Sequence, residues 1–288
     1  MRRYFAICAL GLWGTSLLAG PRPEPVLGER VVLTEQASSF PVSAAFRYLK
    51  DPSHQLEIED LLRARRNAEF VPTRQTVPSF GYPRETVWVR AAVENRTPSE
   101  EFFLEIAYPV LDRFDLFVVA NGRVVHTKQG GDLLPFSARE WKHRNFVFRL
   151  GLPRGTVSWV YLRVRSESAV QLPVTIWTRA AFTEKDHDEQ AVLWIYYGVV
   201  MVMALYNLFL YFSLWDRSYL WYVASIVSVA LLLMVQNGLA YEYLWPTLPG
   251  WNTQAQLATV CFMIFFSLRF ARGYLRAWQN WRSSRGAH

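Results

Sequence analysis

The side chains best suited to chemistry in this chain are scattered charged and aromatic residues, not a compact catalytic motif. Asp186, His187, Asp188 and Glu189 follow one another, and such residue types can bind a metal ion. Consecutive residues of one segment rarely converge on one ion, so we predict no metal site there. The other histidines are dispersed, and no His/Glu spacing matches a metallohydrolase.

Motifs for enzymatic chemistry are missing from the sequence. It contains no nucleophile elbow, no phosphate-binding loop and no dinucleotide fingerprint. Acid pairs such as Asp112 and Asp115 could serve a glycosidase, but any β domain of this size offers such pairs. Cys8 and Cys261 lie too far apart in sequence to suggest a thiol or zinc site. We therefore predict a protein that is not an enzyme and needs no cofactor.

Aromatic side chains between residues 21 and 189 point to ligand binding instead. Sugar sites often combine an aromatic platform with Arg, Asp or Asn side chains. Trp141 is flanked by charged residues, so we expect it to be exposed. Trp88 and Trp159 lie within apolar runs and are expected in the core.

The elements that must position these residues follow from the apolar pattern. Period-two alternation, as in residues 87–91 and 159–164, is typical of half-buried strands. Asn121-Gly122 between two apolar runs indicates a hairpin. One short helix is predicted over Ile58–Arg66, with acids first and arginines last. Residues 21–189 thus predict an antiparallel β-sandwich or jelly roll. Its predicted strands are Thr86–Val93, Phe102–Ile106, Phe114–Val119, Phe146–Leu150, Trp159–Arg165 and Val174–Thr178.

Uncharged runs after residue 190 predict a bundle of three membrane-spanning helices. Ala191–Trp215 has 25 residues without a charge, and a bilayer core requires about 20. Ser218–Tyr241 and Thr253–Ala271 are the second and third runs, so the membrane region is expected over residues 190–272. In the first run, Tyr206 and Asn207 are candidates for coupling, because a polar group in lipid should hydrogen-bond to a neighbouring helix.

The two chain ends carry the basic excess. The formal net charge is +7, but residues 21–189 hold 23 basic and 22 acidic side chains. Such placement sets membrane orientation and argues against a nucleic-acid partner. Residues 1–20 read as a signal peptide or an uncleaved anchor. The arginines of the tail, residues 273–288, predict a cytoplasmic C-terminus and a periplasmic β domain.

Several short motifs, in this order, resemble the bacterial 7TMR-DISM receptors, seven-transmembrane receptors with diverse intracellular signalling modules. The similarity covers roughly residues 30–272. The motifs in the β domain are Tyr48–Pro52, Leu56–Asp60, Val87–Arg90, Glu94-Asn95, Tyr108-Pro109, Leu111-Asp112, Gly131-Asp132, Pro135-Phe136 with Arg139, Phe146–Leu150 and Tyr161–Val164. In the membrane part they are Gly198, Tyr206-Asn207 and Tyr219–Tyr222.

The resemblance implies a periplasmic jelly-roll sensor for a small, carbohydrate-like ligand, coupled through the bacterial inner membrane to an output module. The candidate ligand-binding residues are Arg90, Asn95, Asp112, Asp132, Arg139 and Trp141. Family members continue with four more helices and a catalytic module, so we expect a truncated or split receptor, or an accessory subunit. It would act as a homodimer or with a separate cytoplasmic signalling partner. The alternative is a non-catalytic envelope protein whose β domain binds a protein partner or assembles a larger membrane complex.

Overall fold

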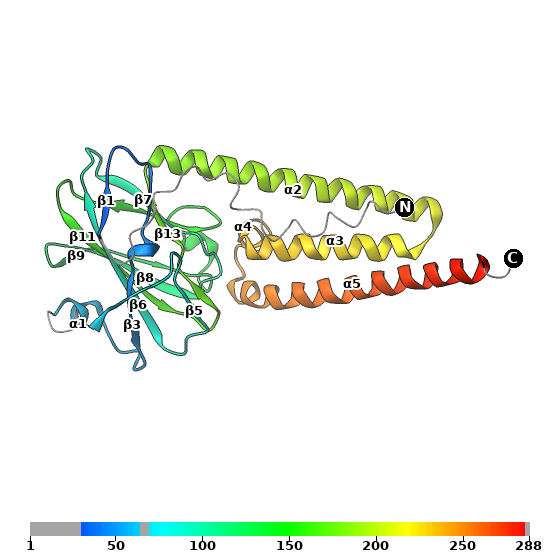
Figure 1. The fold of residues 1–288 in the computed structure, drawn as a ribbon, viewed down its shortest axis with the longest axis horizontal. Helices are drawn as coiled ribbons and strands as arrows, with labels where there is room; N and C mark the ends of the chain where they lie inside the picture. The colour runs from blue at the N-terminus through cyan, green and yellow to red at the C-terminus, as the bar shows by residue number, and fades with distance from the viewer. Residues whose placement is uncertain (1–29, 64–68, 286–288) are drawn as a thin grey trace.

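A β domain and a bundle of helices follow each other along the chain. The computed structural model describes residues 30–63 and 69–285, and the predicted signal segment lies outside these ranges. Figure 1 shows the β domain at one end of an elongated molecule and the helices extending away from it. The last described residues of the chain lie at the far end of the helices.

The larger sheet of the β domain has seven strands. Its order is β4-β3-β6-β11-β8-β9, with β1 paired in parallel to β6 and the other pairs antiparallel. The strands are β1 (Val31–Leu33), β3 (Arg47–Asp51), β4 (Val71–Pro72), β6 (Thr86–Asn95), β8 (Arg113–Ala120), β9 (Arg123–Gly130) and β11 (Val157–Arg165).

A four-stranded antiparallel sheet faces it, in the order β10-β7-β13-β2. These strands are β10 (Phe146–Gly151), β7 (Glu101–Ile106), β13 (Val174–Trp177) and β2 (Ser39–Pro41). A short pair, β5 (Ser79–Gly81) with β12 (Val170–Gln171), completes the domain. The described residues therefore form a β-sandwich, as the strand pattern predicts, and a jelly-roll connectivity stays a prediction.

Alternation along β6 places side chains in two separate cores. Val87, Val89 and Ala91 point into the main core between the two sheets. Trp88 points to the opposite, outer face and is fully buried there. Helix α1 (Ile58–Leu62) and Phe70 cover this outer face. The sheet is thus buried on both sides over part of its area, and the interior position expected for Trp88 is confirmed.

The predicted hairpin and most predicted strands are present. Asn121 and Gly122 have φ values of 52° and 73°, the left-handed pair that a tight hairpin between β8 and β9 requires. Helix α1 is shorter than expected, because the backbone is already extended at Arg63. Residues 64–66 of that prediction lie outside the described residues. Sequence periodicity did not predict the short strands β1–β5 and β12.

Four helices follow the sandwich: α2 (Arg179–Leu214), α3 (Arg217–Gln236), α4 (Leu239–Tyr243) and α5 (Pro249–Arg285). Among the described residues, three helices are long and apolar enough to cross a membrane. The first begins far before the predicted span, capped by the Thr178 hydroxyl, which accepts from the Ala181 N–H. The second ends before its predicted end at Tyr241, because the chain turns at Gly238 (φ 75°) into α4.

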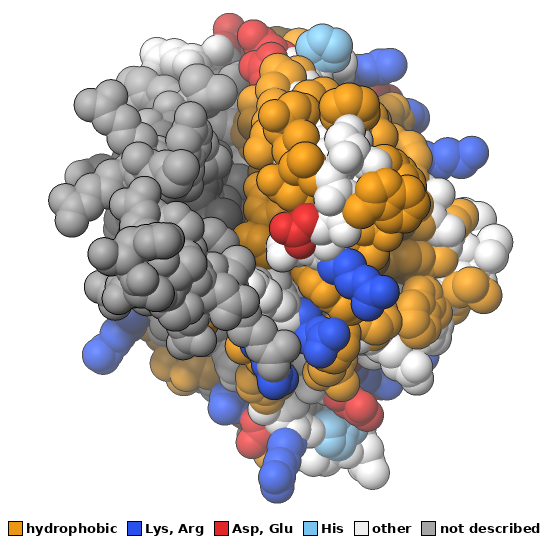
Figure 2. All heavy atoms as spheres, turned by 90° about the vertical axis from the view of Figure 1, so that its right-hand side faces the viewer, with side chains coloured by type: hydrophobic (Ala, Val, Ile, Leu, Met, Phe, Trp, Pro, Cys, Tyr) orange, Lys and Arg blue, Asp and Glu red, His pale blue; other side chains and the backbone are white. Residues whose placement is uncertain are grey.

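The outer surface of the bundle is apolar. In Figure 2, viewed from the end away from the sandwich, hydrophobic side chains cover much of the bundle, and most charged ones lie around it. On α2, Ile195, Val202 and Phe209 are each about two-thirds exposed. Such side chains suit a helix that is surrounded by lipid.

Candidate functional site: an arginine-lined groove and two contacts with the helices

The outer face of the seven-stranded sheet carries an open groove. It has a volume of about 240 Å³, and its lining includes Arg47, Arg90 and Trp159. The remaining lining residues are Arg30, Ala45, Ala91, Ala92 and Val157. This groove is large enough to hold a small ligand.

Strand register brings these side chains together. Arg47 of β3 is the direct cross-strand partner of Arg90 of β6, and Arg90 is the partner of Tyr161 of β11. The Arg90 guanidinium lies 4.2 Å from the centre of the Phe70 ring and 4.9 Å from that of Trp159. It also donates to the Tyr161 hydroxyl at 3.4 Å. Arg90 is therefore held rigidly between two aromatic planes.

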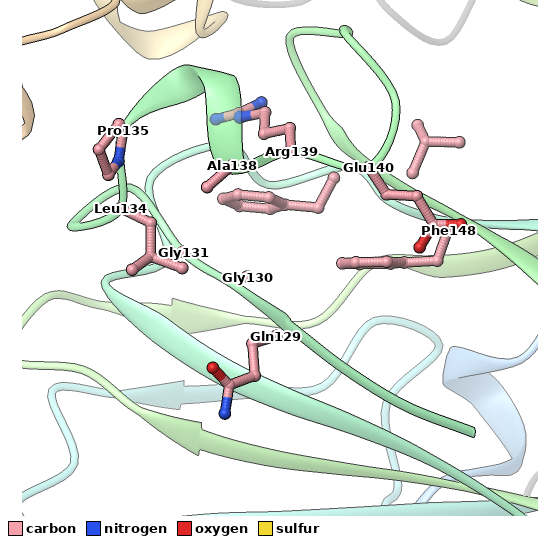
Figure 3. A pocket seen from close by; sticks show the side chains of 11 residues that line it. Gln129, Gly130, Gly131, Leu134, Pro135, Ala138, Arg139, Glu140 and Phe148 are labelled. Carbon is pink, nitrogen blue, oxygen red and sulfur yellow. The ribbon is translucent and has the colours of Figure 1, made fainter. Parts of the chain in front are cut away.

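A second, smaller hollow lies beside Arg139, Phe146 and Phe148 (Figure 3). Its volume is about 10 Å³, whereas one water molecule needs about 10–15 Å³. A sugar cannot enter this space. Arg139 instead packs over the rings of Phe136, Phe146 and Tyr241 at 4.8, 4.3 and 5.8 Å.

The loop after β9 contacts the connection between α3 and α5. The Tyr241 hydroxyl of α4 donates to the carbonyl of Leu134 at 2.6 Å. The Phe136 N–H donates to the carbonyl of Pro246 at 3.0 Å. Asn252 of α5 donates its amide to the Asp132 carboxyl group at 3.3 Å. We call these contacts the loop junction.

Burial changes the ionisation of two groups in the loop junction. Desolvation, followed by the nearby Asp112 carboxylate, raises the pKa of Asp132 to about 7, and the Arg139 charge opposes this change only in part. Desolvation also lowers the pKa of Arg139 to about 10, so Arg139 stays charged at neutral pH.

The first turns of α2 contact the other sheet, and we call this contact the helix junction. Phe182 stacks on Phe103 of β7 at 5.5 Å. Lys185 is 2.6 Å from the buried carboxylate of Glu105, which also accepts from Asn145 at 2.7 Å. The helix junction is continuous with the membrane span, because α2 runs without a break from Arg179 to Leu214.

Residues 143 and 144 add a hydrogen bond and an ion pair to the helix junction. His143 Nδ1 accepts from the Asn145 N–H, so its Nε2 donates to Asp186 at 2.8 Å. Arg144 pairs with Glu189. Arg139 donates to the carbonyls of both His143 and Arg144, at 2.7 and 2.6 Å. One arginine of the loop junction therefore holds the segment that binds α2.

The predicted ligand-binding residues do not form one cluster. Arg90 lines the groove, whereas Asp132 and Arg139 belong to the loop junction. Asp112 accepts from the N–H groups of Glu167 and Ser168 and ties two loops together. These three residues lie away from the groove, and their role as ligand contacts stays a prediction.

Asn95 and Trp141 lie elsewhere again. Asn95 donates to the carbonyls of Ser99 and Leu152, both at 2.7 Å, and is buried. Trp141 is exposed, as expected, with its ring edge-to-face against Phe103 at 5.2 Å. Trp159, expected in the core, is only half-buried and lines the groove.

The coupling residues in the first span differ from each other. Asn207 is buried, but its amide donates to the carbonyl of Met203, one turn earlier in the same helix, at 2.8 Å. The expected bond to a neighbouring helix is therefore wrong, because the second lone pair of the Met203 carbonyl, one turn earlier in the same helix, is within reach. Tyr206 is exposed.

Sequence reasoning did not single out several residues of these sites. They are Arg47, Phe70, Glu105, Lys185, Tyr241 and Asn252. Lys185 could have been recognised from the sequence as a lone base in an acidic stretch, since such a base often pairs with a buried acid. Arg47 could be recognised only from the pairing of β3 with β6.

Within the described ranges, no group of three His, Cys, Asp or Glu side chains could hold a metal ion. Of the four consecutive residues 186–189, Asp186 and Glu189 turn toward the sandwich, while His187 and Asp188 are exposed. Helical geometry separates these side chains.

Solved structures resemble only part of the chain. An insecticidal delta-endotoxin Cry8Ea1 from Bacillus thuringiensis is 16% identical, with a TM-score of 0.22, covering 31% of this chain and 17% of its own. An FMN-binding β-glucuronidase from Faecalibacterium prausnitzii L2-6 is 15% identical, with a TM-score of 0.27. The match covers 48% of this chain and 22% of the glucuronidase. The chain thus spans less than a quarter of either protein. The comparison with curated proteins finds no match.

Two family descriptions match consecutive parts of the chain. Residues 43–178 match "7TMR-DISM extracellular 2", and residues 189–287 match "7TM diverse intracellular signalling". The boundary between them falls within the first turns of α2, where the sandwich meets the helix. The chain belongs to the 7TMR-DISM family of membrane receptors, with an extracellular β domain ahead of its apolar helices.

Proposed function

We propose that this membrane receptor binds a small, carbohydrate-like ligand in the groove beside Trp159. The single observation that carries the proposal is the groove itself, where a half-buried indole adjoins the exposed Arg47 and the fixed Arg90. An aromatic plane and planar hydrogen-bond donors are the groups that bind sugar rings and their hydroxyls. The volume of about 240 Å³ suits a single ring.

Binding would be transmitted through the two junctions. The sandwich holds α2 at the helix junction and the α3–α5 connection at the loop junction. A ligand that changes how the two sheets pack against each other would therefore alter the angle between these helices. A ligand can shift this equilibrium only by its difference in affinity for the two arrangements. The sandwich acts as a sensor and the helices as the transmitter.

The proposal includes the orientation of the receptor. The sandwich faces the periplasm across the bacterial inner membrane, and the arginines after residue 268 lie on the cytoplasmic side. The output is then made by another copy of the chain or by a separate cytoplasmic partner, without catalysis by the residues described here.

Thermal unfolding of the full chain in lipid nanodiscs tests the function. A panel of monosaccharides and sugar acids is added, since a ligand that binds the native state raises the melting temperature. We expect at least one member to do so, and Trp159→Ala to abolish the shift. Trp141→Ala is the matched control, because its exposed indole lies outside the groove.

Two results would contradict this proposal. If Trp141→Ala abolishes the shift and Trp159→Ala does not, the ligand binds at the face of the four-stranded sheet. If no compound shifts the melting temperature while a protein partner co-purifies, the envelope-protein alternative is favoured.

A further inference from the structure

We propose that the loop junction responds to protons: the sandwich holds the connection between α3 and α5 while Asp132 carries a proton, and releases it when this proton is lost to the surrounding water. The proton is then a second input to the receptor, separate from any ligand of the groove. The response occurs without a ligand, so it can be measured without one.

Asp132 lies in the loop after β9, at the contact with the helices. The residue is 3% exposed, and its Oδ2 accepts from the Asn252 amide of α5 at 3.3 Å. Its Oδ1 is buried without a hydrogen-bond partner among the described residues. A buried carboxylate requires several donors to offset the water that it has lost, whereas a protonated carboxyl group requires fewer. The surroundings of Asp132 therefore suit its neutral form.

A second buried acid beside Asp132 has a different environment. Asp112 accepts from the N–H groups of Glu167 and Ser168 and from the Ser168 hydroxyl, so three donors contact its carboxylate. The two loops are close, because the N–H of Leu133 donates to the carbonyl of Asp112 at 3.3 Å. Neighbouring carboxylates repel each other, so the one with fewer donors keeps a proton more readily. That one is Asp132.

The other polar groups that face Asp132 do not neutralise its charge. Arg139, after the short 3-10 helix that follows the loop, is the cation that acts on it. No ion pair joins the two in the ranges that the structure describes, and Arg139 donates to the carbonyls of residues 143 and 144 instead. Tyr108, ahead of β8, and Tyr241 of α4 contribute phenols, which are uncharged at neutral pH.

Burial links this proton to the docking of the helices. It is the main reason that the pKa of Asp132 rises to about 7, followed by the Asp112 charge. Separation of α4 and α5 from the sandwich would admit water to the carboxyl group, and its pKa would fall toward the ordinary 3.8. The docked arrangement therefore binds the proton more tightly and is stabilised by it. This stabilisation decreases as pH rises from about 4 to 7, so ionisation shifts the equilibrium toward separation.

Release at the loop junction would act on two helices and leave the third attached. α2 has its own contact with the sandwich, where Phe182 stacks on Phe103 and Lys185 pairs with Glu105. The α3–α5 connection depends on the loop junction instead, through the bonds of Tyr241 and Asn252 among others. Loss of the proton would therefore change the position of α3 and α5 relative to the sandwich and the start of α2.

The experiment measures the distance between the sandwich and α5 in the full chain in nanodiscs, by pulsed electron paramagnetic resonance and without any ligand. Spin labels are attached at Thr127→Cys on β9 and Gln254→Cys on α5, which are exposed positions. Cys8→Ser and Cys261→Ser remove the native thiols. We expect one distance at about pH 4.5, and a second, longer distance whose population grows as pH rises to about 8. Returning to low pH should restore the first distance.

Variants identify the group that titrates. Asp132→Asn cannot ionise, so it should keep the short distance at every pH. Asp112→Asn should reduce the long-distance population at high pH, because an ionised Asp132 is no longer repelled. Its amide can retain the bonds to Glu167 and Ser168, since its oxygen accepts and its nitrogen donates. The matched control is Glu167→Gln, an exposed acid at the same loop contact, which should respond like the wild type.

Three results would overturn the proposal. The first is a distance that does not change between these pH values in the wild type. The second is a pH response that persists in Asp132→Asn, because another group then titrates. The third is an equal effect of Asp112→Asn and Glu167→Gln. Melting temperatures at low pH show that each variant is folded, and if Asp132→Asn is not, the other proteins still decide. Failure to find a sugar ligand would leave this proposal unaffected.

Discussion

Asn252, near the start of α5, donates a hydrogen bond of 3.3 Å to the side chain of Asp132, which lies 120 positions earlier in the sandwich. Both residues are buried. The bond joins the extracellular domain directly to a helix that can cross the membrane. Burial raises the pKa of the Asp132 carboxyl group in this bond to about 7. The loop junction therefore contains a titratable group.

Asp132 should make stability depend on pH. In the unfolded chain its pKa is near 3.8, so between about pH 4 and 7 the native state keeps a proton that the unfolded state releases. The free energy of unfolding then falls by about 4 kcal/mol at most as pH rises through this window. Above this window Asp132 makes no further contribution to the pH dependence. Asp132→Asn cannot ionise and should flatten this part of the profile. Melting temperatures of both proteins in nanodiscs from pH 4.5 to 8 measure the difference, and parallel profiles would contradict the prediction.

Gly238 should be irreplaceable at the loop junction. Its φ is 75°, and a Cβ there would lie 2.7 Å from the carbonyl oxygen of Arg144 and 2.8 Å from the Cβ of Pro109. Gly238→Ala should therefore lower the free energy of unfolding by about 1–3 kcal/mol and separate α4 from the sandwich. Gly198→Ala is the control, since nothing lies within 4 Å of its Cβ and alanine favours the helix. Equal melting temperatures for the two variants would show that the close contact is absent.

The strands and spans were predictable because each depends on a local pattern. The period-two runs of β6 and β11 and the uncharged run in α2 specify their own structure. The groove was not predictable, since Arg47 and Arg90 become neighbours only through the register between β3 and β6. Arg90 was a candidate from its motif alone.

The partners of polar side chains were not predictable for a similar physical reason. Residue type identifies Asp112 and Asn95 as hydrogen-bonding groups, but not their partners, which are backbone groups of distant loops. Asn207 was expected to bond between helices, whereas it uses a carbonyl of its own helix. Partner choice depends on tertiary geometry, which a single sequence does not encode locally.

The tryptophans should differ in their effect on stability. Trp88 is fully buried, stacked on Phe117 at 5.9 Å under α1. Trp88→Ala should cost about 3–5 kcal/mol, because it leaves a large cavity in the outer core. Trp141→Ala removes an exposed ring and should cost well under 1 kcal/mol. Chemical unfolding followed by fluorescence compares them, and similar losses would disprove the assignment of Trp88 to a core.

The ion pair between Lys185 and Glu105 should hold α2 in its position on the sandwich. Glu105 is 2% exposed, so its charge depends on Lys185 at 2.6 Å and on the Asn145 amide. Lys185→Gln leaves a buried carboxylate without its cation and should cost about 3–5 kcal/mol. Adding Glu105→Gln to that variant removes the unpaired charge and should restore much of the stability. Glu184→Gln, at an exposed position one residue away on α2, should have little effect. Thermal unfolding of the wild type, Lys185→Gln, Glu105→Gln and the double variant gives the coupling energy. Additive effects of the two substitutions would mean that the sandwich does not hold α2 through this pair.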